Sequence, residues 1–277
     1  MLALAAAVAA DAAAQEPRVP YVPTPQEVVD RMLGIAKVGP QDYLIDLGSG
    51  DGRIVITAAR KHKTRGFGVD LNAVRIEEAN ENARRAGVTD RVAFYQRDLF
   101  QTDLASATVI TMYLLPQVNI ELRPRLLELK PGTRLVSHDF DMGDWKPDTH
   151  VTMESKEKYG GSGGTSDIYF WVVPAAAAGI WQWELPAAGK PQPYELTLEQ
   201  KYQEISGSVR AGGSTAKITG ARLRGEEIRL AMTGRVGGRA WHHLFRGKLA
   251  AGRIAGEVRI SDGENNRTLP WTATRTR

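Results

Sequence analysis

The feature that most constrains the fold is an alternation of short β-branched runs with helical stretches between residues 40 and 173. Parallel strands need crossover connections, and these are usually helices, so the alternation indicates an α/β sheet that is mostly parallel. The runs expected to form strands are residues 43–47, 66–70, 92–96, 109–113, 134–139 and 168–173. We therefore expect a doubly wound sheet with helices on both of its faces.

A helix is expected to begin just before the first of these strands, at Thr24-Pro25-Gln26-Glu27. Thr24 and Glu27 have the spacing of a capping box, in which each side chain bonds the backbone of the other. Pro25 suits the first helical position because its fixed φ angle is already helical.

The pattern changes at residues 174–179, which read PAAAAG. From Trp181 onward short alternating runs recur roughly every ten residues, with glycine-rich breaks between several of them. These runs are residues 194–200, 205–210, 216–223, 228–233, 241–247, 254–260 and 268–273. The pattern is typical of an antiparallel meander, so we expect a small lipocalin-like barrel or sandwich. The predicted segments are a signal-like or disordered stretch at residues 1–18, an α/β domain at 19–174 and a β-rich domain at 180–277.

The first residues have the pattern of a secretory signal. Residues 2–10 are apolar and are followed by Ala12-Ala13-Ala14-Gln15, a small-residue cleavage site. The run is too short to span a membrane, and no positive charge precedes it, since Arg18 is the first basic residue. We expect export, with the periplasm as the compartment, and keep a cytoplasmic location as the alternative.

Composition excludes some classes of site. The chain has no cysteine, so it can hold no thiol nucleophile, zinc finger or iron–sulfur cluster. Residues 178–277 carry 16 Lys and Arg against 9 Asp and Glu, whereas residues 1–177 carry 20 against 23. The basic residues are scattered along strands rather than clustered with aromatics, so we interpret them as a solvated face and expect no nucleic-acid partner.

The first expected strand runs into a glycine loop, DLGSGDGR at residues 46–53, and then directly into a helix. In open α/β sheets ligands bind at the carboxyl ends of strands, where glycine lets the backbone approach them closely. A dinucleotide fingerprint would need a third glycine at the position of Arg53. The carboxylates of Asp46 and Asp51 also disfavour a pyrophosphate and favour a cationic ligand. We therefore expect a nucleoside that carries a positive charge, with Ser49 among the loop contacts.

Further acids follow the next two expected strands. Asp70, at the end of the second strand, is placed to accept hydrogen bonds from both ribose hydroxyls. After the third strand, Asp98 offers a carboxylate for an exocyclic amine and Leu99 an apolar surface for adenine. Each acid alone could equally be a helix cap or a surface residue. Their occurrence at successive strand ends favours a shared nucleoside site.

Several motifs together resemble the archaeal protein-lysine methyltransferases and, more distantly, the mitochondrial lysine methyltransferases. These motifs are VPYVPTP at residues 19–25, the glycine loop, TVITMYLL at residues 108–115 and KPGTRLVSH at residues 130–138. The resemblance covers roughly residues 19–173. It implies a Rossmann-like class I methyltransferase sheet, S-adenosyl-L-methionine as cofactor and a protein with an accessible lysine as partner.

Methyl transfer to an amine requires a neutral acceptor held in line with the donor, in a channel that excludes water. Tyr113, at the end of the fourth strand, is the candidate to line this channel, with Thr111 beside it as a cofactor contact. Tyr21 is placed to close over the cofactor as part of an N-terminal lid. Asp139, after the fifth strand, is a candidate proton acceptor. The alternatives are packed tyrosines and, for Asp139, an acid on the rim.

Two other reaction classes stay open at this stage. One is methylation of a small molecule, with the β-rich domain capturing the substrate. The other is a non-catalytic binding protein whose β-rich domain holds an unknown ligand or partner. His242 and His243 are adjacent on an expected strand and so face opposite sides, which disfavours a metal site. The tryptophans of the β-rich domain are expected to form its core or rim.

Overall fold

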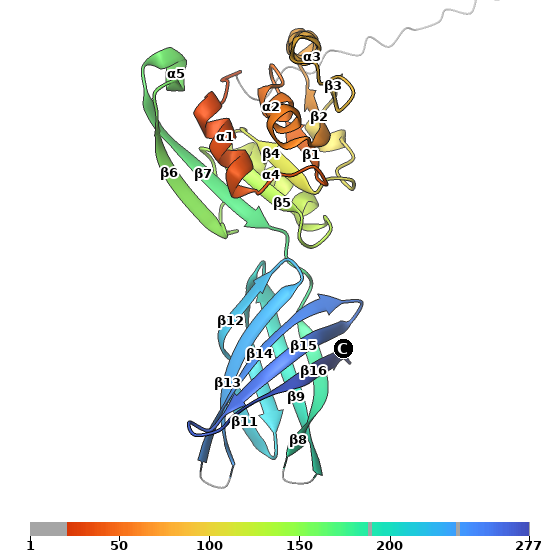
Figure 1. The fold of residues 1–277 in the computed structure, drawn as a ribbon, viewed down its shortest axis with the longest axis vertical. Helices are drawn as coiled ribbons and strands as arrows, with labels where there is room; N and C mark the ends of the chain where they lie inside the picture. The colour runs from red at the N-terminus through yellow and green to blue at the C-terminus, as the bar shows by residue number, and fades with distance from the viewer. Residues whose placement is uncertain (1–20, 188–189, 237–238, 277) are drawn as a thin grey trace, which may run out of the picture.

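The computed structural model describes residues 21–187, 190–236 and 239–276. It contains two sheets, which Figure 1 shows one above the other with the chain passing once between them. The signal-like segment predicted at residues 1–18 lies outside the described residues. The connection between the last strand of one sheet and the first strand of the other covers residues 173–178.

The first sheet has seven strands in the order β3-β2-β1-β4-β5-β7-β6. They are β1 (Tyr43–Leu47), β2 (Arg65–Asp70), β3 (Val92–Gln96), β4 (Val109–Met112), β5 (Arg134–His138), β6 (Thr149–Ser155) and β7 (Gly164–Val172). The first five strands pair in parallel, whereas β7 runs antiparallel to β5 and to β6. The predicted α/β fold is confirmed. β6 was missed, because it is an edge strand whose side chains are mostly exposed and carry no strong apolar alternation.

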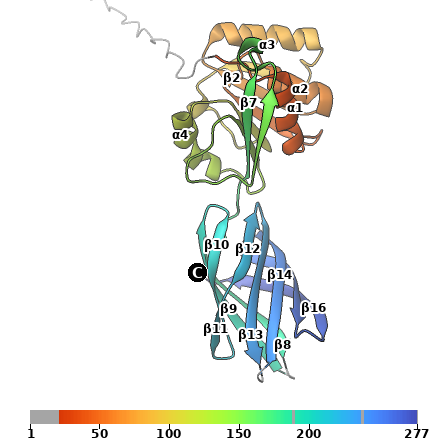
Figure 2. The same ribbon diagram turned by 90° about the vertical axis from the view of Figure 1, so that its left-hand side faces the viewer.

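Helices cover both faces of this sheet, as expected. They are α1 (Gln26–Ile35), α2 (Arg53–His62), α3 (Ala73–Ala86), α4 (Pro116–Leu127) and the short α5 (Lys158–Gly161), with a 3-10 turn at Leu99–Gln101. The first three share one apolar core, while α4 packs into the core on the opposite face, and Figure 2 shows this separation. No described helix has both the length and the apolar composition needed to cross a membrane.

The capping box expected at the start of α1 is wrong. The helix begins at Gln26, and Pro25 is the residue that caps it, without a side-chain hydrogen bond. The Oγ1 atom of Thr24 lies 3.2 Å from Nδ1 of His138 instead. Glu27 accepts a 2.7 Å hydrogen bond from the backbone nitrogen of Lys156. Both side chains therefore have partners distant in sequence, and these replace the local cap.

The second sheet has nine antiparallel strands in the order β11-β10-β9-β8-β16-β15-β14-β13-β12. They are β8 (Gly179–Ala187), β9 (Lys190–Lys201), β10 (Glu204–Ala211), β11 (Ser214–Lys217), β12 (Thr219–Arg224), β13 (Glu227–Val236), β14 (Arg239–Ala250), β15 (Arg253–Ser261) and β16 (Asn266–Arg275). The two ends of this order, β11 and β12, are consecutive in the chain and are linked by Ile218, whose backbone amide donates a 3.0 Å hydrogen bond to Gly207 of β10. The sheet therefore curls into a nearly closed barrel. The predicted β-rich barrel is confirmed.

The barrel interior is filled by aromatic and aliphatic side chains. Trp181, Trp183 and Trp271 are buried in it, as expected of core tryptophans. His243 faces this core and is 7% exposed, whereas its neighbour His242 faces outward and lies 3.0 Å from Oγ1 of Thr233. The two imidazoles thus lie on opposite sides of β14.

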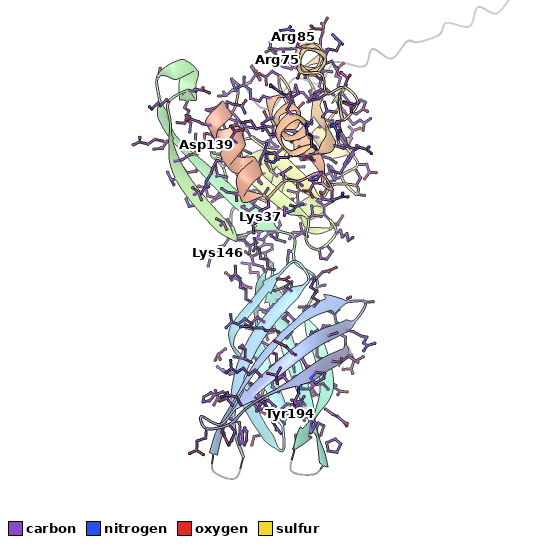
Figure 3. The ribbon with its side chains drawn as sticks, viewed as in Figure 1. Lys37, Arg75, Arg85, Asp139, Lys146 and Tyr194 are labelled. Atoms are coloured by element: carbon purple, nitrogen blue, oxygen red, sulfur yellow. The ribbon has the colours of Figure 1, made fainter. Side chains whose placement is uncertain are left out.

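The turn between β9 and β10 packs against the α/β part. Trp145, in the connection after β5, is fully buried, and its indole nitrogen donates a 2.8 Å hydrogen bond to Oε1 of Gln203. The ring of Tyr202 stacks on Trp145 at a centroid distance of 5.7 Å. Lys146 lies at this junction in Figure 3, where its backbone carbonyl accepts a hydrogen bond from Gln203. The barrel therefore contacts the chain segment that leads away from the end of β5.

Candidate active site

A cavity of about 300 Å³ opens at the carboxyl ends of β1, β2, β3 and β4. This is the edge at which ligands bind in open α/β sheets. One side of the cavity is formed by the chain segment that precedes α1. Its lining includes Tyr21, Thr24, Asp46, Gly48, Ser49, Gly50, Asp51, Arg53, Asp70, Asn72, Arg75, Asp98, Leu99, Tyr113 and Leu114.

The glycine loop needs glycine at Gly50 for two separate reasons. Its φ angle is +50°, and a Cβ atom built there would lie 2.5 Å from the ring of Tyr21. The loop thus lets an aromatic ring from the N-terminal segment lie directly on its backbone. The amide of Gly50 in turn donates a 3.0 Å hydrogen bond to Asp70.

Asp46 is almost completely buried at the base of the cavity, with 2% of the residue exposed. Burial raises the pKa of its carboxyl to about 7, against the opposing effect of a hydrogen bond from Thr111, and the nearby Asp51 and Asp70 raise it further. The hydroxyl of Thr111 donates to Oδ1 at 2.7 Å. A cation bound beside Asp46 would stabilise its ionised form, so the site is electrostatically suited to a positively charged ligand.

Asp70 is held in place by the backbone. Its Oδ2 atom accepts from Gly50, and its Oδ1 atom accepts a 2.9 Å hydrogen bond from the amide of Asn72. Each carboxylate oxygen can accept a further hydrogen bond, so both remain able to bind hydroxyl groups on a ligand. A carboxylate fixed in this way is suited to a ribose diol.

Asp98 acts as a cap at the wall of the cavity. Its Oδ1 atom accepts a 2.8 Å hydrogen bond from the amide of Phe100, so it caps the 3-10 turn. The same residue lines the cavity together with Leu99. The cap fixes the carboxylate at the cavity wall.

Arg53 holds the segment that precedes α1 against the glycine loop. This guanidinium donates to both carboxylate oxygens of Asp51, at 3.0 and 2.6 Å, and to the backbone carbonyl of Thr24 at 2.9 Å. The ring of Tyr21 lies beneath the guanidinium of Arg75, at 4.5 Å from its centroid. Arg53 stands where a dinucleotide-binding loop would have its third glycine. Its hydrogen bonds thus position the N-terminal segment that was predicted to form a lid.

Another part of the cavity wall is formed by Tyr113. Its hydroxyl donates a 2.9 Å hydrogen bond to Oδ2 of Asp139, and its ring packs on His138 at a centroid distance of 4.0 Å. Burial lowers the pKa of His138 to about 4, with Asp139 opposing this shift and Lys158 adding to it, so the imidazole is neutral at neutral pH. Tyr113 lines the cavity, whereas Asp139 lies behind it and is not among the described lining residues.

Lys158 completes this wall from behind. Its Nζ atom lies 2.8 Å from Oδ1 of Asp139 and also donates to the backbone carbonyl of Thr165. Only 5% of Lys158 is exposed. The residue comes from α5, at the tip of the arm that β6 and β7 form, and it was not recognised in the sequence.

Comparison with known proteins identifies relatives of the α/β part. The model of a family described as the ANTKMT methyltransferase domain matches residues 46–149. A protein-lysine N-methyltransferase from Saccharolobus islandicus is 50% identical over 140 residues, which cover 50% of this chain and 87% of the relative. The chain belongs to this methyltransferase family. The predicted resemblance is thereby confirmed.

Other relatives share the same region. The mouse adenine nucleotide translocase lysine N-methyltransferase is 34% identical over 131 residues, which span 47% of this chain and 57% of the mouse enzyme. A crystal structure described as an RNA methyltransferase from Salinibacter ruber, bound to S-adenosyl-L-homocysteine, is 51% identical. It covers 56% of this chain and 95% of that chain, with a TM-score of 0.51.

S-adenosylmethionine is the cofactor of this methyltransferase, and the described residues fit it. The buried carboxylate of Asp46 suits the positive charge of the methionine part, and Asp70 presents two oxygens to a ribose. Asp98 and Leu99 offer a polar and an apolar contact at the far side of the same cavity. No phosphate-binding feature is needed, in agreement with Arg53 in place of a third glycine.

Most of the predicted contact residues meet at one cavity. Tyr21, Asp46, Gly48, Ser49, Gly50, Asp70, Asp98, Leu99 and Tyr113 all line it. Thr111 and Asp139 each lie one hydrogen bond behind a lining residue, and their individual roles stay predictions. Sequence reasoning missed Asn72, Arg75 and Lys158. The first two follow Asp70 closely in the sequence, and this proximity was the available signal.

Proposed function

We propose that this methyltransferase transfers the methyl group of S-adenosylmethionine to the side-chain amine of a lysine in a protein. The observation that carries the proposal is the aromatic ring of Tyr113, which lines the same cavity as the carboxylates of the cofactor side and packs on the buried His138 behind it. The archaeal relative named as a protein-lysine N-methyltransferase supports it, since the match covers most of that enzyme. The matched region spans only about half of the mouse relatives, so their substrates are not transferred.

The acceptor must arrive as a neutral amine, although a lysine in water has a pKa of about 10.4. Burial against Tyr113, Leu114 and Val118, which line the cavity, disfavours the charged form. The hydroxyl of Tyr113 donates a hydrogen bond to Asp139, and a hydroxyl oxygen can also accept a hydrogen bond from an N–H of the amine. That contact would point the nitrogen lone pair away from the wall.

When bound, S-adenosylmethionine supplies a methyl group attached to a positively charged sulfur. The transfer forms one C–N bond and breaks one C–S bond, the sulfur keeps the electron pair, and the acceptor nitrogen loses one proton. The protein's contribution is therefore alignment, exclusion of water and control of the acceptor's protonation. Tyr21 and the segment fastened by Arg53 cover the cofactor side, while Tyr113 forms the acceptor side.

The proposal is tested with methyl-labelled S-adenosylmethionine and total cell extract, and the label is followed in protein, RNA and small-molecule fractions. The inactive control is Asp70→Asn, which removes one charge from the cofactor site. The matched control is Asp90→Asn, since the side chain of Asp90 is 70% exposed and lies outside the cavity. Label on lysine-containing peptides that disappears only in the first variant is the expected result.

A second acceptor, RNA, is favoured by one observation: the 51% identical protein from Salinibacter ruber is described as an RNA methyltransferase. Label that is released by ribonuclease and absent from protein would overturn the lysine proposal in favour of RNA. Label found only in small molecules would overturn both acceptors.

We also propose that the protein is exported, on the basis of the apolar run and small-residue site in residues 2–15. Fractionation of cells that express the full chain, with mass spectrometry of its N-terminus, tests this. A periplasmic protein that begins near Gln15 is expected. An unprocessed protein confined to the cytoplasm would contradict export and leave the methyltransferase proposal intact.

A further inference from the structure

A buried ion pair lies directly behind the acceptor wall. The Nζ atom of Lys158 is 2.8 Å from the carboxylate of Asp139, and both side chains are almost fully enclosed, at 6% and 12% exposure. Figure 3 labels Asp139 on the side of the α/β part where the arm of β6, α5 and β7 stands. The methyl-transfer chemistry described above does not require this cation, so its presence needs a reason.

Asp139 is held by contacts on several sides. Its backbone has a φ angle of +59°, and the amide of Phe140 donates to the carbonyl of His138, which closes a three-residue turn around it. Residues other than glycine rarely adopt this conformation, so the surrounding structure must enforce it. The amide of Asp167 donates a 3.1 Å hydrogen bond to the same carboxylate. The carboxylate that Tyr113 uses is therefore fixed from three directions.

The charge of Asp139 affects the chemistry through Tyr113. A carboxylate one hydrogen bond behind the wall would, if unbalanced, stabilise an approaching ammonium and raise its pKa. Methyl transfer needs the opposite, because only the neutral amine has a free lone pair. A cation next to Asp139 cancels the stabilisation of the ammonium and leaves the hydrogen bond between Tyr113 and Asp139 in place.

The other titratable groups around the pair do not supply that balance. His138 is neutral at neutral pH, since burial lowers its pKa to about 4. Asp167 is engaged with His150, whose Nε2 lies 2.8 Å from its carboxylate, on the exposed side of the arm. Tyr169, beyond Asp167, has its pKa raised by burial and remains uncharged. Lys158 is the cation nearest to Asp139 among the described ion pairs.

We propose that Lys158 is a positioning residue for methyl transfer: it cancels the charge of Asp139 and so presents Tyr113 to the acceptor as a neutral, oriented hydroxyl. The inference rests on the proposed transfer to lysine and adds how the site controls the protonation of the acceptor. It also gives the arm of β6 and β7 a role, since this arm carries Lys158 to the wall.

The test is the pH dependence of kcat/KM with the lysine acceptor that the labelling experiment identifies. Lys158→Met leaves the negative charge of Asp139 without a partner cation. The pH at which kcat/KM rises is then expected to increase by about one unit. Asp139→Asn leaves Lys158 unbalanced and is expected to lower this pH. The double variant, which removes both charges, is expected to return close to the wild-type profile, and Lys158→Arg is expected to keep it.

A second readout does not depend on turnover. The binding of n-butylamine, a model of the lysine side chain, is measured by NMR in the presence of S-adenosylhomocysteine at pH 7. Lys158→Met is expected to bind this ammonium about tenfold more tightly than the wild type, which corresponds to one pKa unit. Cofactor affinity, measured by calorimetry, is expected to stay within about twofold in every variant.

Variants whose rates fall uniformly, with superimposable pH profiles and equal affinity for n-butylamine, would reduce Lys158 to a structural role and overturn the inference. A wild-type enzyme that methylates no lysine would overturn the proposed function instead. In that case the n-butylamine measurement still decides whether Lys158 balances the charge of Asp139.

Discussion

The two sides of the cavity are built by different means. On the cofactor side, the carboxylates of Asp46, Asp70 and Asp98 lie at or near the carboxyl ends of β1, β2 and β3 and accept hydrogen bonds from a hydroxyl or from backbone amides. On the acceptor side, Tyr113 is held by Asp139, which depends in turn on Lys158 from a separate arm. The cofactor side thus presents negative charge to a cationic ligand, whereas the acceptor side cancels its charge behind a neutral wall. One cavity can therefore favour a cationic donor and disfavour a cationic acceptor.

Asp70→Asn is expected to have the largest effect, and it acts on the cofactor side alone. Hydrogen bonds to a charged group contribute about 1.5–3 kcal/mol each, so weakening two of them should raise the cofactor Kd on the order of 100-fold. Isothermal titration calorimetry measures this change, with the exposed Asp90→Asn as the control. A Kd within about threefold of the wild type would show that the ribose is bound elsewhere.

Tyr113→Phe is the matching change on the acceptor side. It keeps the ring against His138 and removes only the hydroxyl that donates a hydrogen bond to Asp139, so kcat should fall about 30-fold through lost positioning of the acceptor. The cofactor Kd should stay unchanged, because the nucleoside contacts lie across the cavity. Steady-state kinetics together with calorimetry separates the two effects. A rise in the cofactor Kd as large as the fall in kcat would contradict the separation of the cavity into a cofactor side and an acceptor side.

Gly50→Ala tests the contact between the glycine loop and the lid. A methyl group at this position would lie 2.5 Å from the ring of Tyr21, so we expect the cofactor Kd to rise about tenfold. Gly87→Ala is a matched control, since Gly87 has a φ angle of +65° but open space around it. Both variants carry the same kind of backbone strain, and only one has the clash. Similar cofactor affinities in the two variants would contradict a lid role for Tyr21.

The smallest expected effect is a pH dependence of cofactor affinity that arises from Asp46. Its pKa of about 7 means that the carboxyl is mostly protonated at pH 6 and mostly ionised at pH 8. A cationic ligand favours the ionised form, so affinity should rise about fivefold over this interval. Calorimetry at both values of pH measures the change, and Asp46→Asn should abolish it. A slope that persists in the variant would assign the titration to another group.

The same shift has a consequence for the stability of the cofactor-free protein. Because the folded pKa of Asp46 is raised, the group's contribution to stability is fully present below its unfolded pKa and is lost as the pH rises through about 7. Cofactor binding therefore opposes a loss of stability that Asp46 itself causes near neutral pH.

The cofactor side could be predicted from sequence because its determinants are local. The glycine loop, Asp70 and Asp98 lie at or just after the carboxyl ends of β1, β2 and β3, and parallel strands bring these ends to one edge. The barrel was equally accessible, through its alternating runs and glycine-rich breaks. Its first strand, β8, was not among the expected strands, although Trp181, Trp183 and Leu185 alternate with polar residues in it. The break between β11 and β12 could not be placed, because only a register shift near Gly220 divides what is otherwise one alternating run.

The acceptor side could be predicted only in part. Tyr113 and Asp139 stand at strand ends and were visible as candidates. Lys158 was not, because a lysine in a polar segment is normally exposed, and only the folding of β6 and β7 into an arm buries it. The same holds for Thr24, which the local sequence assigns to a helix cap and the structure places beside His138.

Lysine methylation is tested most directly by tandem mass spectrometry of the proteins labelled by the wild-type enzyme, which locates the transferred methyl group on a single atom. We expect label on the side-chain nitrogen of lysine, lost in Asp70→Asn and kept in Asp90→Asn. Label on RNA, or on no macromolecule at all, would contradict transfer to a protein lysine.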